Sequence, residues 1–168
     1  MGRVLVAYAT KYGSTKEVAE KVAAALRDGG KDVDVRPAHE TAGVDGYSAV
    51  VLGAPLYMFR WHKNARHFLS RNKKALAETP VAVFALGPMT PDKPEEFEGA
   101  RQQLDKALAK YKWLTPRSIE VFGGKFDPTG LRFPDNLPAV RALPASDLRD
   151  WDAIGVWAAA LPGLLGIN

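Results

Sequence analysis

The sequence contains no cysteine, which excludes disulfide bonds, thiol nucleophiles and every zinc or iron–sulfur site built on thiolate ligands. It also lacks a long apolar run, because Gly155, Pro162 and Gly163 interrupt the stretch over residues 153–167. A bilayer-spanning helix needs about 18 such residues. The N-terminus has neither the apolar core nor the cleavage site of a secretory signal. We therefore expect a cytoplasmic chain with at most peripheral membrane contact.

Neither sign of charge dominates, since 23 Lys and Arg residues oppose 19 Asp and Glu residues. With 46% hydrophobic residues over 168 positions, this balance is typical of a folded chain, and we interpret residues 1–168 as one domain. The densest basic stretch covers residues 60–74 and holds no acidic residue. It indicates either a solvated helix face or a surface that attracts anions. We expect no nucleic-acid partner.

Strand-like and helix-like segments alternate along the chain. We expect strands over residues 3–8, 32–36, 49–53, 80–86 and 118–122, and helices over residues 15–28, 64–78, 94–111 and 147–161. Ser146 or Asp147 is the expected cap of the last helix. Continuous apolar strands predict an α/β fold, a doubly wound, five-stranded parallel sheet of order 2-1-3-4-5 with helices on both faces. Residues 123–146, rich in Pro and Gly, form an irregular insert before the last helix.

The loop after the first strand carries the clearest chemical signal. It contains Thr10, Lys11, Tyr12, Gly13, Ser14 and Thr15 and leads directly into the first expected helix. Hydroxyl groups and backbone N–H groups at a helix N-terminus form a cradle for phosphate, and glycine lets the backbone wrap closely around the anion. The alternative is an ordinary capped helix, with Ser14 as the cap and Glu17 completing a capping box.

Several other anion-binding signatures are missing. The chain has neither a G-x-x-x-x-G-K-[ST] loop nor a G-x-G-x-x-G loop, which argues against nucleoside triphosphatases and dinucleotide-binding enzymes. The first and third expected strands end in residues 7–9 and 53–55 without a carboxylate, so an acidic phosphorelay receiver is not expected either. The three histidines are not spaced as ligands, and we expect no metal site.

Residues 6–19, VAYATKYGSTKEVA, resemble the first strand, loop and helix of the flavodoxin family. Thr10, Gly13 and Thr15 match the [ST]-x-[ST]-G-x-[ST] loop of that family, whereas Tyr12 departs from it. GAPLY at 53–57, the basic stretch and FGGKFDP at 122–128 are most similar to the menaquinone-dependent protoporphyrinogen IX dehydrogenase branch.

The resemblance implies a flavodoxin-like fold that binds FMN. The phosphate would lie on residues 10–15, and two further loops would flank the ring. These loops comprise Pro55, Leu56, Tyr57 and Met58 on one side and Leu86, Gly87, Pro88 and Met89 on the other. Tyr57 is the candidate for stacking on the flavin, and its alternative role is packing at a strand end.

The resemblance also implies an FMN-dependent oxidoreductase similar to protoporphyrinogen IX dehydrogenase, with quinone as an expected acceptor. Arg60, Lys63 and Arg66 would meet the propionates of a porphyrinogen or an acidic redox partner protein. No residue is predicted to be a general acid or base. One alternative is a flavodoxin-type electron carrier with no substrate of its own, although the chain is net basic and residues 86–89 lack an aromatic. The other alternative is a flavin-free anion-binding or interaction domain.

Overall fold

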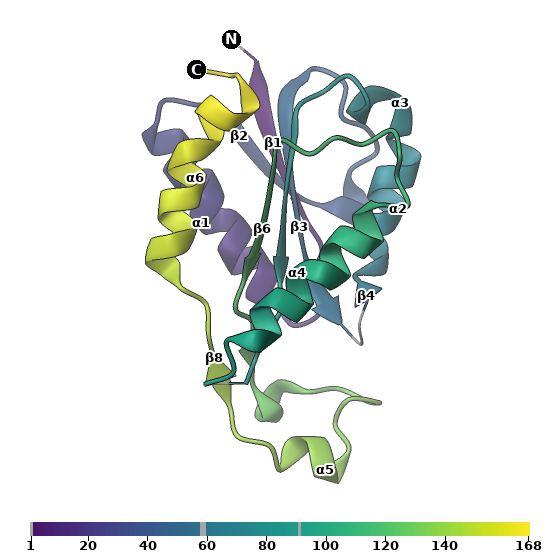
Figure 1. Ribbon diagram of the computed structural model, residues 1–168, viewed down its shortest axis with the longest axis vertical. Coiled ribbons are helices and arrows are strands. Elements are labelled where there is room, and N and C mark those ends of the chain that lie inside the picture. Colours follow the sequence, from purple (N-terminus) through teal and green to yellow (C-terminus); the bar gives the residue numbers. More distant parts are fainter. Residues whose placement is uncertain (1, 58–59, 91) are drawn as a thin grey trace.

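A computed structural model describes residues 2–57, 60–90 and 92–168 and places the five main strands in one parallel sheet (Figure 1). Along the chain these are β1 (Arg3–Tyr8), β2 (Val33–Pro37), β3 (Tyr47–Tyr57), β5 (Val81–Leu86) and β6 (Ser118–Phe122). Their spatial order is β2-β1-β3-β5-β6, which confirms the predicted doubly wound topology.

Helices cover both faces of the sheet (Figure 1). One face carries α1 (Ser14–Asp28) and α6 (Trp151–Leu165), and the other carries α2 (Lys63–Arg71), α3 (Lys73–Leu76) and α4 (Glu95–Leu108). A short 3-10 turn, η1 (Ala38–Glu40), follows β2.

The two-sided cover explains why the strands are apolar without alternation. In β1, Val4 and Val6 join the core beneath α1 and α6, whereas Leu5 and Ala7 join the core beneath α2 and α4. All four side chains are fully buried. Successive residues of a strand point to opposite faces, so each face receives every second apolar side chain.

Gly53 allows the close packing at the middle of the sheet. A Cβ atom at this position would lie 1.9 Å from Cζ of Phe84 on the neighbouring strand β5. The Phe84 ring in turn packs edge-on against Trp157 of α6, with ring centroids 5.9 Å apart. Trp157 therefore packs a helix onto the sheet, and a larger side chain at Gly53 would displace this aromatic contact.

Two predicted boundaries were wrong. Strand β3 continues to Tyr57 rather than ending at Gly53, because its last two residues pair with the short antiparallel strand β4 (Arg60–Trp61). The helix predicted over 64–78 is divided at Asn72, whose backbone leaves the helical region. The Asn72 side-chain amide donates to the Phe68 carbonyl at 2.9 Å, a local bond that competes with helix continuation.

The start and end of the last helix also differ from the prediction. Its cap is Asp150, whose carboxylate accepts a hydrogen bond from Ala153 N–H at 3.0 Å. The predicted caps instead form β8 (Ser146–Asp147), which pairs with β7 (Lys125–Phe126). The helix continues beyond residue 161 and ends at Leu165, with Pro162 inside it.

The insert projects from the carboxyl edge of the sheet, at the end of the molecule opposite both termini (Figure 1). Its regular structure comprises β7, a 3-10 turn η2 (Pro128–Gly130), the four-residue helix α5 (Pro138–Arg141) and β8. The insert is irregular, as predicted, and Pro128 and Pro138 each lie at the start of a short helical segment, where proline is tolerated. Among the residues described, none of the helices has the length and apolar character required to cross a bilayer.

Candidate functional site

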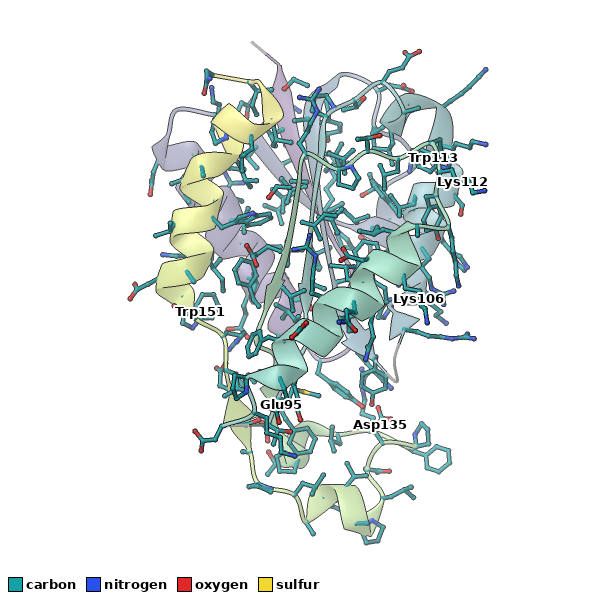
Figure 2. All side chains as sticks on the ribbon, viewed as in Figure 1. Glu95, Lys106, Lys112, Trp113, Asp135 and Trp151 are labelled. Atoms are coloured by element: carbon teal, nitrogen blue, oxygen red, sulfur yellow. The ribbon has the colours of Figure 1, made fainter. Side chains whose placement is uncertain are left out.

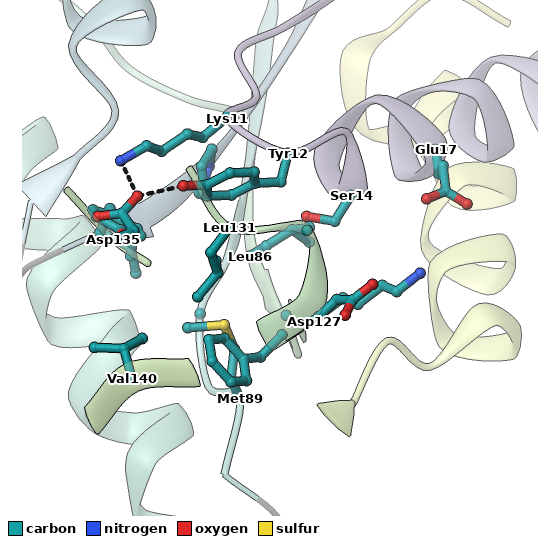
Figure 3. Close-up of a pocket in the computed structure, with 18 residues that line it drawn as sticks. Lys11, Tyr12, Ser14, Glu17, Leu86, Met89, Asp127, Leu131, Asp135 and Val140 are labelled. Atoms are coloured by element: carbon teal, nitrogen blue, oxygen red, sulfur yellow. Dashed lines mark hydrogen bonds and ion pairs between the residues drawn. The ribbon is translucent and has the colours of Figure 1, made fainter. Parts of the chain in front are cut away.

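A cavity of about 240 Å³ lies at the carboxyl edge of the sheet, where ligands bind in folds of this topology (Figure 3). The loop after β1 with the first turn of α1, the carboxyl end of β3, and the end of β5 with the residues after it form one part of its wall, and the insert forms the other. Nine of the lining residues belong to the three predicted segments: Lys11, Tyr12, Ser14, Pro55, Leu56, Tyr57, Leu86, Gly87 and Met89.

The remaining predicted loop residues hold different places. Four of them are sequence neighbours of lining residues but do not line the cavity themselves: Thr10, Gly13, Thr15 and Pro88. Pro88 is buried, and its carbonyl accepts a hydrogen bond from Gly124 N–H at 2.7 Å, which fastens the loop after β5 to the insert. Met58 lies outside the described residues.

The loop after β1 is shaped by glycine rather than by a side-chain cap. Gly13 is the N-cap of α1 and adopts a φ of 93°, a conformation that favours glycine, and Ser14 is already the first helical residue. The alternative of a capping box made by Ser14 and Glu17 was therefore wrong. The Thr10 hydroxyl accepts a hydrogen bond from Gly13 N–H at 2.9 Å, and a hydroxyl that accepts can still donate.

Thr15 provides the observation that favours an anion at this helix end. Its side chain is fully buried in the first turn of α1, and within the described part of the chain its hydroxyl oxygen has no hydrogen-bond partner. Leaving such a group unpaired costs roughly 1–3 kcal/mol. A ligand oxygen at the positive end of α1 would satisfy this hydroxyl, so the residues present fit a phosphate group.

At the other end of the cavity, Asp135 joins the insert to the loop after β1. Its carboxylate accepts hydrogen bonds from the Lys11 ammonium and the Tyr12 hydroxyl, and its side chain points toward the edge of the sheet (Figures 2 and 3). The Lys11 ammonium also lies 4.7 Å from the centroid of the Tyr57 ring. One acidic side chain thus connects the insert to the loop after β1 and, through Lys11, to Tyr57 at the end of β3.

These contacts change the titration of the groups involved. The hydrogen bond with Lys11 is the main reason that the pKa of Asp135 is lowered from its ordinary value, and the same bond raises the pKa of Lys11. Burial raises the pKa of Tyr57. At neutral pH, the cavity therefore contains a carboxylate, an ammonium and a neutral phenol side by side.

The sequence prediction missed Glu17 of α1 and the part of the cavity wall that the insert supplies. The missed insert residues are Gly124, Lys125, Phe126, Asp127, Gly130, Leu131, Asp135 and Val140. One signal could have found most of them. The insert begins directly after the fifth main strand, and its first residues must therefore lie at the ligand-binding edge of the sheet.

The predicted partner residues Arg60, Lys63 and Arg66 lie beside the cavity and do not line it. Arg60 is exposed on β4, opposite Tyr57, and Lys63 is exposed at the start of α2. Arg66 is half-buried, and its guanidinium donates to the Trp61 carbonyl at 3.0 Å. Arg60 and Lys63 are therefore exposed to solvent, while Arg66 stabilises the turn before α2.

A sequence profile of the flavodoxin domain matches residues 5–137. The chain belongs to the flavodoxin domain family. A curated relative of this flavodoxin is protoporphyrinogen IX dehydrogenase [quinone] from Escherichia coli K12. The two are 25% identical over 135 residues, which cover 79% of this chain and 71% of the relative.

Solved structures of flavodoxins show the same fold. The Streptococcus pneumonia TIGR4 flavodoxin superposes with a TM-score of 0.59 at 19% identity, covering 95% of this chain and 97% of that one. Rubredoxin oxygen:oxidoreductase from Desulfovibrio gigas superposes with a TM-score of 0.59 at 14% identity. That match covers 99% of this chain and 36% of the larger protein. The flavodoxin fold implies a flavin cofactor and a role in electron transfer.

Proposed function

We propose that this flavodoxin binds one FMN noncovalently and acts as an oxidoreductase similar to protoporphyrinogen IX dehydrogenase. The observation that carries the proposal is a cavity bordered by three features: the first turn of α1, the ends of β3 and β5, and apolar residues of the insert. When bound, FMN supplies reversible uptake of electrons, and the chain supplies position, charge and exclusion of water.

The phosphate end is proposed at the first turn of α1. The hydroxyls of Thr10, Ser14 and Thr15 donate to phosphate oxygens, together with the N–H groups of the turn and the positive end of the helix dipole. Gly13 keeps the loop tight enough for the backbone to reach the anion. This arrangement recognises the phosphate and therefore favours FMN over a flavin without one.

The ring end is proposed between the carboxyl end of β3 and the end of β5 with the loop that follows it. Leu56, Tyr57, Leu86 and Met89 supply mostly apolar surface there. The Lys11 ammonium covers one face of the Tyr57 ring, so a flavin that stacks on that face must displace Lys11. Such a displacement would also change the contact between Lys11 and Asp135.

An enzyme is favoured over a simple electron carrier by the insert. Phe126, Leu131 and Val140 extend the cavity wall beyond the three loops, and they provide apolar surface for a small substrate beside the ring. Arg60 and Lys63 lie on the same edge and could pair with the propionates of a porphyrinogen. The substrate loses electrons and protons, and by analogy with the named relative a quinone accepts them.

The second candidate is an electron carrier without a substrate of its own. The match to the Streptococcus pneumonia TIGR4 flavodoxin favours this function, because it covers nearly the whole length of both chains. In that case, the exposed charges of Arg60 and Lys63 steer an acidic redox partner protein. The third candidate, a flavin-free anion-binding domain, requires that the cavity retain no FMN.

The test is an anaerobic assay of protoporphyrinogen IX oxidation with a soluble menaquinone analogue, using protein loaded with FMN. The proposal expects quinone-dependent turnover that disappears in a Thr10→Val/Thr15→Val variant unable to retain FMN. Absence of porphyrinogen turnover, combined with rapid reduction by a flavodoxin reductase, would favour the carrier instead. A matched Thr79→Val variant, altered at the opposite edge of the sheet, should keep the activity of the unmodified protein.

A further inference from the structure

Arg149 is a buried cation beneath the proposed phosphate end. The residue lies between the end of the insert and the start of α6, and its side chain is only 3% exposed. Its guanidinium holds Asp147 through two hydrogen bonds, from Nε at 2.9 Å and from Nη2 at 2.8 Å. It also lies over the ring of Trp151, 4.7 Å from the centroid, at the lower end of α6 (Figure 2).

The third nitrogen of Arg149 faces α1 rather than the insert. Nη1 lies 3.3 Å from the Ser14 carbonyl oxygen and 3.3 Å from a carboxylate oxygen of Glu17. Both residues line the cavity. The guanidinium therefore joins the end of the insert to the same helical turn that contains the unpartnered Thr15 hydroxyl.

The Glu17 carboxylate would repel a phosphate bound at the first turn of α1, and Arg149 can reduce this repulsion. A carboxylate in the first turn of a helix is stabilised by the helix dipole, and a phosphate bound there is stabilised by the same positive end. The two anions therefore repel each other. The Arg149 guanidinium is buried and supplies a counter-charge beside Glu17, although it shares that charge with Asp147 and water partly screens the 56% exposed Glu17 side chain.

We propose that Arg149 is a positioning residue for phosphate recognition: it offsets part of the negative charge of Glu17 and fixes the Ser14 turn, so that α1 accepts a phosphorylated flavin. This inference rests on the proposed function, since it assigns a role within the same site. The hydrogen bond with Asp147 raises the pKa of Arg149, so the guanidinium is charged at neutral pH.

The experiment compares FMN with riboflavin, which has the same ring and no phosphate. Dissociation constants for both are measured by flavin fluorescence in the unmodified protein, Arg149→Gln, Glu17→Gln and the double variant. Arg149→Gln should weaken FMN binding about tenfold and riboflavin binding less than threefold, the range expected for a charge effect at a helix end. Adding Glu17→Gln to Arg149→Gln should restore most of the lost FMN affinity.

Equal weakening of FMN and riboflavin, or no recovery in the double variant, would overturn the inference and make Arg149 a purely structural residue. If Arg149→Gln does not fold, Glu17→Gln alone tests the same repulsion. It should strengthen FMN binding two- to fivefold with riboflavin unchanged, and unchanged FMN binding contradicts the inference. Arg149→Lys should keep the preference for FMN. An unmodified protein that binds neither flavin would instead contradict the proposed function.

Discussion

The two ends of the cavity are held in place by different interactions. At the phosphate end, the backbone turn at Gly13 and the buried Thr15 belong to α1, whose inner face is packed into the core through Val18 and Val22. At the ring end, the insert is held over the cavity by polar side chains that meet at Asp135. The first end is fixed by the fold, whereas the second combines backbone bonds such as Gly124 N–H to the Pro88 carbonyl with charged contacts at Asp135, which a ligand or a change of pH can release.

The largest loss of FMN affinity is expected from substitutions at the phosphate end of the cavity. Thr10→Val/Thr15→Val should weaken FMN binding at least about 100-fold, because two hydrogen bonds to a charged group contribute roughly 1.5–3 kcal/mol each. Riboflavin binding should change much less. Fluorescence titration measures both affinities, and equal losses for the two flavins would place the phosphate elsewhere.

Thr15→Val alone sharpens this prediction because affinity and stability should move in opposite directions. Valine has nearly the same shape and removes a buried hydroxyl that has no partner among the described residues. The flavin-free variant should therefore be more stable by about 1 kcal/mol in urea unfolding, while its affinity for FMN falls. A loss of stability would show that this hydroxyl already has a partner, such as an internal water.

A smaller effect is expected at the ring end. Asp135→Asn replaces a carboxylate that binds the Lys11 ammonium and the Tyr12 hydroxyl with a neutral amide. Hydrogen exchange over residues 128–141 should accelerate about tenfold, the consequence of losing roughly 1.4 kcal/mol of local stability. Exchange in α1 should not change.

Asp127→Asn is the matched control for this substitution. Asp127 lies in the same insert, but its carboxylate bonds to Thr129 within the insert rather than to the sheet loops. It should leave the exchange of residues 131–141 unchanged. Equal acceleration in both variants would mean that Asp135 has no special part in closing the insert.

The pH dependence of stability follows from the same contact. The pKa of Asp135 is lowered from 3.8, chiefly by Lys11, and the pKa of Asp147 is lowered from 3.8, chiefly by Arg149. A carboxyl group with a lowered folded pKa contributes stability above its unfolded pKa, and this contribution is lost as the pH falls through the folded value. The free energy of unfolding should therefore decrease as the pH falls below about 5.

Asp135→Asn should make this decrease shallower, since one of the titrating groups is gone. Urea unfolding at several pH values measures the slope, and Glu98→Gln, which removes an exposed carboxyl group of α4, is the control. An unchanged slope in Asp135→Asn would contradict the assignment of that lowered pKa.

The smallest effect on the flavin is expected from the basic residues outside the cavity. Arg60→Glu/Lys63→Glu should change FMN affinity less than twofold, because neither residue lines the cavity. It should nevertheless reduce the rate with an anionic substrate or acidic partner and weaken the salt dependence of that rate. Lys73→Glu/Lys74→Glu makes the same change in net charge on α3, and equal behaviour of both variants would refute a local role for Arg60 and Lys63.

The sheet and the first cavity loop could be predicted from the sequence because both are local signals. Apolar runs mark the strands, and the glycine between hydroxyl residues marks the turn before α1. The contact between Tyr12 and Asp135 could not be predicted, because it joins residues 123 positions apart. The break at Asn72 and the cap at Asp150 were missed for a related reason, since several nearby polar residues could serve and packing selects among them.

The most direct test of the cavity assignment is the visible absorption spectrum of the purified protein after FMN is added and the excess is removed by gel filtration. The account predicts flavin absorption that elutes with the unmodified protein and is absent from Thr10→Val/Thr15→Val. A colourless unmodified protein under these conditions would contradict the proposed flavin site at α1 and leave an anion-binding cavity without a redox group.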